Sequence, residues 1–153
     1  MPQSAHATKD APRRRIETNV GTFDVAAADT IDFPDGLPGF ERCRRFVVIS
    51  SDDIAPLSCL HAVEGPSASF LAVDPRVVMP AYRCLLTDAD RVKLGVTDDA
   101  APLLWLALVT VDAGQGPSVN LRAPVVINPA RMLGCQVMPH DSLYPLRHPL
   151  AAE

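Results

Sequence analysis

Apolar and polar residues alternate along most of the chain after residue 15, a period of two that is typical of β-strands with one buried face. This alternation and the runs of β-branched residues predict strands within residues 16–20, 22–25, 31–33, 46–49, 57–63, 70–73, 103–111, 124–127 and 135–138. Proline, glycine, aspartate and asparagine separate nearly all of these segments. Many short strands at this spacing predict an all-β fold, either a sandwich or a small barrel-like antiparallel domain.

One or two short helices are expected within this strand pattern. Thr87 precedes residues 88–94 and stands three positions before Asp90, an imperfect form of the capping box that begins many helices. A second helical turn is plausible within residues 75–80. Fifteen residues are proline, roughly twice the average usage, and proline interrupts helices. We therefore do not expect a helical bundle.

The length of 153 residues fits one domain. Residues 1–15 show no hydrophobic period, so we expect a disordered tail there, followed by a barrel domain at residues 16–150. The tail ends in three arginines, which fit a solubilising segment or, alternatively, a nucleic-acid hook. It holds four basic residues against one acidic residue, so the remainder carries a net charge of −7 within a total of −4. Such a body repels phosphate and favours a basic protein partner.

Cysteine spacing and hydropathy indicate a reduced, cytoplasmic protein. Cys43, Cys59, Cys84 and Cys135 are scattered without a C-x-x-C pair, which fits neither a zinc site nor a disulfide framework. The N-terminus lacks the apolar region of a signal peptide, and the longest apolar run, residues 102–109, is too short to span a membrane. We expect a monomer without a membrane partner.

The most distinctive segment is residues 33–41, here named the knuckle, in which two turns follow each other closely. Phe33-Pro34-Asp35-Gly36 suits a type I turn, and Leu37-Pro38-Gly39-Phe40 suits type II, whose third residue needs a positive φ that glycine adopts freely. Two proline-fixed turns hold Leu37 and Phe40 in a rigid arrangement. These two side chains either plug one end of the barrel or form part of a docking surface, and both roles can hold together.

The knuckle also resembles the signature of the FliW family of flagellar assembly factors, Phe-Pro-x-Gly-Leu-Pro-Gly-Phe-Glu. The resemblance continues, in the same order along the chain, at residues 70–75, 80–82, 120–128, 136–137 and 144–150. It therefore extends from residue 16 to residue 150.

The resemblance implies a small, cytoplasmic, barrel-like β protein without catalytic activity or cofactor. It also implies two protein ligands: CsrA, a small dimeric RNA-binding regulator of translation, and newly made flagellin. In that family FliW binds CsrA away from its RNA surface and lowers its RNA affinity. Flagellin competes for FliW and thereby frees CsrA to repress flagellin translation. Flagellin is held either by strand addition at a sheet edge or as an amphipathic helix in a groove.

This chain departs from the family at one strand end. Family members commonly read Leu-Gln-Ser followed by acidic residues where this chain reads Leu60-His61-Ala62-Val63-Glu64. If that strand end contacts a partner, His61 makes the contact sensitive to pH near the ordinary histidine pKa of about 6.5. The arginine-bearing tail is a second departure, and its role is not implied by the family.

The predicted partner-binding residues come from the knuckle, this strand end and two asparagines: Leu37, Phe40, Glu41, His61, Glu64, Asn120 and Asn128. For Asn120 and Asn128 the alternative is that their amides satisfy backbone groups at turns or sheet edges. Knuckle residues likewise serve folding, binding or both.

Candidates for catalysis or metal binding are weak. The aspartate pairs Asp88/Asp90, Asp98/Asp99 and Asp52/Asp53 fit solvated turns and caps better than a general acid and base, which need unequal surroundings. No histidine or mixed histidine–cysteine cluster has metal-ligand spacing, so we expect neither a metal nor a cofactor. The alternative to a protein-binding barrel is a small barrel that binds or hydrolyses a small molecule, which requires a deep pocket with convergent polar groups.

Overall fold

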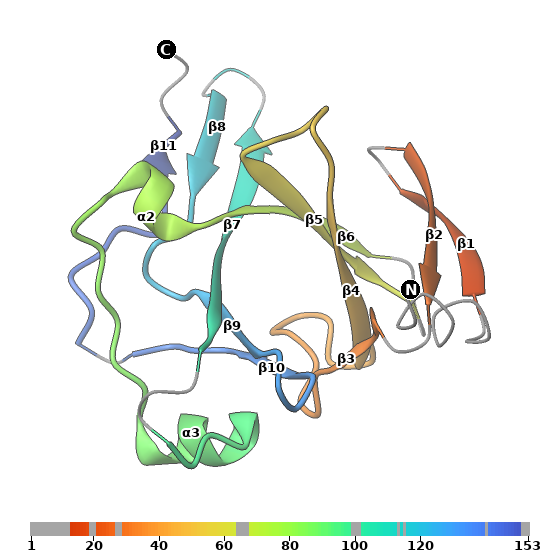
Figure 1. Ribbon diagram of the computed structural model, residues 1–153. Helices are drawn as coiled ribbons and strands as arrows, with labels where there is room; N and C mark the ends of the chain where they lie inside the picture. The colour runs from red at the N-terminus through yellow and green to blue at the C-terminus, as the bar shows by residue number, and fades with distance from the viewer. Residues whose placement is uncertain are drawn as a thin grey trace.

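Seven strands close into a barrel that dominates the part of the chain described by the computed structural model (Figure 1). The described residues are 13–18, 21–26, 29–63, 68–98, 102–112, 114, 116–139 and 141–150. The barrel strands are β3 (Ile31–Asp32), β4 (Arg45–Ser50), β5 (Leu57–Ala62), β6 (Ser69–Val73), β7 (Leu104–Asp112), β9 (Val125–Asn128) and β10 (Leu133–Gln136). The prediction of an all-β, barrel-like domain is therefore confirmed.

Strand β7 closes the barrel because it is long enough to pair with three neighbours. One edge pairs with β6, while the other pairs with β9 over residues 104–106 and with β8 (Gly116–Val119) over residues 109–112. Strand β11 (His148–Pro149) continues the sheet beyond β8. The pairings are antiparallel except for the contact between β3 and β10. Closure removes most exposed strand edges.

Both predicted helices are present. Helix α3 covers Asp88–Leu94, the predicted range, and its capping box is complete: the Asp90 amide donates to Thr87 Oγ1, and the Thr87 amide donates to Asp90 Oδ2, each at 3.1 Å. Gly95 ends the helix with a φ of 67°. The shorter α2 (Pro75–Val78) begins after Asp74, whose Oδ1 accepts the Arg76 amide at 2.9 Å. Side chains within a few residues therefore account for both helix starts.

Several strand boundaries differ from the sequence predictions. β10 lies two residues earlier than predicted because it pairs with β9 from Leu133 opposite Asn128, directly after a turn at Met132, whose φ is 52°. β8 and β11 were not predicted; they gain their β conformation from pairing with β7 and with each other. β7 and β8 pair antiparallel over residues 109–112 and 116–119.

The N-terminal hairpin corrects one boundary of the predicted tail. Strand β1 (Arg13–Thr18) pairs with β2 (Gly21–Ala26) in a separate two-stranded sheet. The three arginines at 13–15 therefore lie in a strand, because residues 24–26 pair with them across the hairpin, whereas the tail prediction placed them outside regular structure. Residues 1–12 lie outside the described part of the chain.

The barrel interior is packed with aromatic and aliphatic side chains, among them Phe33, Phe46, Leu60 and Val125, all fully buried. Phe33 lies so close to Gly134 of β10 that a Cβ there would stand 2.5 Å from the ring. Glycine at 134 is therefore a packing requirement. Within the described residues, no helix has the length and apolar character needed to cross a membrane.

Candidate protein-binding surface

Both predicted knuckle turns form. The Gly36 amide donates to the Phe33 carbonyl at 2.8 Å, and the Phe40 amide donates to the Leu37 carbonyl at 2.7 Å. Gly39 has a φ of 84°, as the third residue of a type II turn requires. Gly36 also has a positive φ, 65°, and a Cβ on it would lie 2.7 Å from Glu41 Cα and from the Phe40 carbonyl oxygen. The two turns are therefore held by hydrogen bonds and by close backbone packing.

The two apolar side chains of the knuckle have different positions. Leu37 is buried in the main core, whereas Phe40 is 40% exposed. The ring of Phe40 packs edge-on against Phe70, with centroids 5.1 Å apart, and a chain of aromatic contacts continues through Phe46 to Phe33 inside the barrel. Leu37 therefore plugs the barrel, and Phe40 links the surface to the core.

Glu41 is exposed beside Phe40. Its Oε2 accepts the Gly39 amide at 3.0 Å, and backbone hydrogen bonds, chiefly this one, lower the pKa of the Glu41 carboxyl. The side chain is therefore ionised at neutral pH and held over the second turn. An aromatic ring next to a fixed negative charge suits contact with a basic protein surface.

His61 and Asn128 are buried, at 7% and 2% exposed. The His61 ring bonds through Nδ1 to Ser69 Oγ across β5 and β6, and burial lowers its pKa, so the ring is neutral at neutral pH. Asn128 donates from Nδ2 to the Leu94 carbonyl at the end of α3, at 2.7 Å, and accepts the Ala130 amide at 3.2 Å. Both side chains have their partners inside the fold.

Asn120 organises the corner between β8 and β9. Its Oδ1 accepts the backbone N–H groups of Arg122 and Ala123, each at 3.0 Å. The backbone N–H of Asn120 donates to the Leu108 carbonyl. The alternative interpretation of the two asparagines, that they satisfy backbone groups, therefore describes what both side chains do. Glu64, the remaining predicted residue, lies outside the described residues.

The side chains considered for catalysis or metal binding serve helix capping or core packing. Asp90 belongs to the capping box of α3, and Cys43 and Cys59 are buried. Burial raises the pKa of the Cys84 thiol. It also raises the pKa of the Cys135 thiol, to about 11, and both thiols are therefore protonated and poorly nucleophilic at neutral pH. The described residues contain no group of histidine, cysteine and carboxylate side chains that could hold a metal ion.

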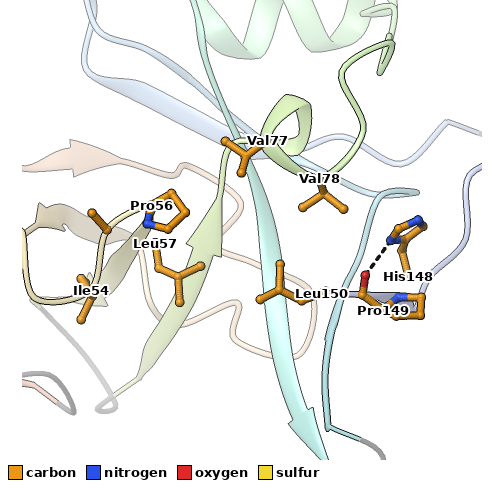
Figure 2. A pocket seen from close by; sticks show the side chains of 9 residues that line it. Ile54, Pro56, Leu57, Val77, Val78, His148, Pro149 and Leu150 are labelled. Carbon is orange, nitrogen blue, oxygen red and sulfur yellow. Dashed lines mark hydrogen bonds between the residues drawn. The ribbon is translucent and has the colours of Figure 1, made fainter. Parts of the chain in front are cut away.

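An apolar pocket of about 330 Å³ lies between the β4–β5 turn, α2 and the C-terminal segment (Figure 2). Residues 54–57, Val77 and Val78 of α2, and residues 148–150 line it. The His148 ring is the one polar side chain of this lining, and its Nδ1 bonds to the Pro149 carbonyl at 2.9 Å. A small-molecule site needs several convergent polar groups, so this lining suits an apolar side chain better.

Sequence reasoning missed the pocket because its walls come from three segments far apart along the chain. The available signal was an apolar triplet, Ile54-Ala55-Pro56, in a turn where polar residues are usual. An apolar turn at the surface is usually covered by a partner protein or by another segment of the same chain. The triplet alone does not show which of the two covers it.

Comparison with known proteins gives consistent relatives. A family model described as FliW protein matches residues 15–150. The flagellar assembly factor FliW of Syntrophotalea carbinolica is 36% identical over 141 residues, covering 92% of this chain and 99% of that protein. The protein of the same name from Desulfitobacterium hafniense is 33% identical over 136 residues, covering 89% of this chain and 90% of that protein. A crystal structure of the flagellar assembly factor FliW has a TM-score of 0.81 and 28% identity, covering 92% of this chain and 99% of that one.

Proposed function

The chain belongs to the FliW family, and we propose that it is a flagellar assembly factor that binds CsrA and flagellin in mutually exclusive complexes. The observation that carries the proposal is the match to the family model over residues 15–150. The relatives are named as assembly factors and not as enzymes, and we propose a protein-binding role without catalysis. The proposed place of action is the cytoplasm, where both partners are made.

Mutually exclusive binding is sufficient for such a switch. Each partner removes the protein from the pool available to the other by mass action. The bound protein lowers the RNA affinity of CsrA only if binding and RNA recognition on CsrA are coupled, typically by about 1–3 kcal/mol. When flagellin accumulates it takes up the protein, and free CsrA represses flagellin translation.

The knuckle supports this proposal with one accessible contact surface. Of the predicted partner-binding residues, Phe40 and Glu41 are the exposed pair in the described part of the chain, and we propose them as an interface with CsrA. The net negative charge of the body adds to the attraction of a basic partner and acts mainly on the association rate.

Calorimetry with purified CsrA and purified flagellin tests the proposal. We expect each protein to bind the wild-type chain, and added flagellin to displace CsrA. Glu41→Lys should weaken CsrA binding with only a small drop in the melting temperature, because the hydrogen bond that it removes, from the Gly39 amide to Glu41 Oε2, is exposed. Asp141→Lys, at another exposed position, is the matched control. Absence of binding to both proteins contradicts the proposal.

A further inference from the structure

The apolar pocket is the starting point for a second contact surface. Its volume of about 330 Å³ lies at the lower end of the range for ligand sites. Val77 on its rim is 55% exposed, while Leu57, Val78 and Leu150 pack against the buried cluster around Val73 and Tyr82. The floor is therefore continuous with the core, and a large apolar side chain entering it gains contacts on several sides.

The neighbouring sheet edge is poorly suited to strand addition. In β11, His148 lies opposite Val119 of β8. Directly after β11, the Leu150 amide donates to the Pro117 carbonyl at 3.1 Å. Pro149, between them, has no amide hydrogen, and its carbonyl is bonded to His148 Nδ1. An incoming strand would find neither a donor nor a free acceptor at this residue, which favours side-chain insertion at this end of the barrel.

The rim of the pocket on the turn side is acidic. A second, shallower hollow of about 460 Å³ shares Ala55, Pro56 and Leu57 with the apolar pocket and is lined by Asp52 and by Ser50, Ser51 and Ser58. Asp52 and the adjacent Asp53 are both exposed. On the helix side, Asp74 and Arg76 carry opposite charges two residues apart, so this segment adds no net charge. The exposed charge on the turn side of the pocket is thus complementary to a lysine or arginine.

We propose that the apolar pocket receives an apolar side chain from a partner protein segment that carries a basic side chain next to it, the basic group lying over Asp52. This inference rests on the proposed function, since it assigns a second contact surface for a protein partner. The pocket and the knuckle are at different ends of the barrel: α2 and β11 lie in the upper part of Figure 1, and β3, which leads into the knuckle, lies in the lower part. Substitutions at the two surfaces should therefore act independently.

Two substitutions of one pocket residue test both parts of the proposal. Val77→Lys places a positive charge at the pocket rim and should lower the affinity for CsrA or for flagellin at least tenfold. Val77→Glu removes the same apolar contact but retains the attraction for a basic group, so its loss should be clearly smaller. Asp52→Lys should slow association of the same partner and make the rate less dependent on salt.

Val92→Lys is the matched control, because Val92 is also an exposed valine on a short helix, 80% exposed, and lies on α3 away from the pocket. It should change neither affinity more than twofold, and the melting temperatures of all four variants should stay close to wild type. Wild-type protein that binds neither CsrA nor flagellin contradicts the proposed function and this inference together.

Three results contradict the inference alone. One is wild-type affinity of Val77→Lys for both proteins, and another is an equal loss with Val77→Glu and Val77→Lys. The third is a change confined to the oligomeric state, measured by light scattering, which would assign the pocket to a second copy of this chain.

Discussion

The knuckle and the apolar pocket are the two most notable surface regions of this barrel, and they are built in opposite ways. The knuckle comes from nine consecutive residues, is closed by two turn hydrogen bonds and sends Leu37 into the core. The pocket is assembled from three distant segments and leaves a cavity between them. The strong local motif thus marks a folding constraint that also leaves Phe40 and Glu41 exposed, whereas the cavity has almost no local signature in the sequence.

The largest expected effect tests whether the knuckle is a rigid scaffold. Gly36→Ala combines a positive φ with contacts of 2.7 Å to backbone atoms, and should destabilise the protein by about 3 kcal/mol or more. Gly39→Ala is the matched comparison, because it has a φ of 84° but no atom within 4 Å of the added Cβ, and should cost about 1 kcal/mol. Urea denaturation measures both. Equal losses would show that close packing at Gly36 is unimportant.

A smaller effect distinguishes scaffold from interface at Asn128. Asn128→Ala leaves the buried Leu94 carbonyl without its donor and should cost about 1–3 kcal/mol of unfolding free energy. Affinity for CsrA and flagellin, measured at a temperature where the variant is folded, should be unchanged. Weakened binding by a fully folded Asn128→Ala protein would indicate that this residue contributes to partner binding.

Phe40→Ala should affect binding more than folding. It removes the edge-on contact with Phe70, which is worth about 0.5–1.5 kcal/mol in such pairs, while the inner aromatic contacts remain. Calorimetry should show a clear loss of affinity for CsrA. Val77→Lys, measured in parallel, tests the apolar pocket. Unchanged binding by Phe40→Ala would leave the knuckle with a purely structural role.

The smallest expected effect is a pH dependence of stability that comes from His61, a residue outside both the knuckle and the pocket. Burial lowers the pKa of His61 in the folded state below the value of about 6.5 in the unfolded chain. The unfolded state therefore binds the proton more readily, so stability should fall as pH drops through about 6.5 and level off below the folded pKa. Replacing the ring, as in His61→Gln, should flatten this part of the stability profile. An equally steep profile in the variant would contradict the assignment.

Sequence patterns predicted the elements that depend on neighbours along the chain. The limits of α3 follow from the Thr87–Asp90 capping box and from Gly95, all within residues 87–95. The knuckle turns likewise follow from Pro34, Pro38 and their glycines. In contrast, β8, β11 and the start of β10 depend on strands brought alongside by the barrel, and the sequence pattern missed or misplaced them.

The candidate binding surface shows the same division between features set by nearby residues and features set by distant segments. The sequence predicts a β protein with two rigid turns and an acidic body, and its motifs resemble those of the FliW family. Only the tertiary structure decided that His61 and Asn128 point inward, that Phe40 stays exposed, and that Pro56, Val77 and Leu150 surround one cavity. The reason is that turns and caps depend on hydrogen bonds within a few residues, while burial depends on which distant segments the closed barrel places side by side.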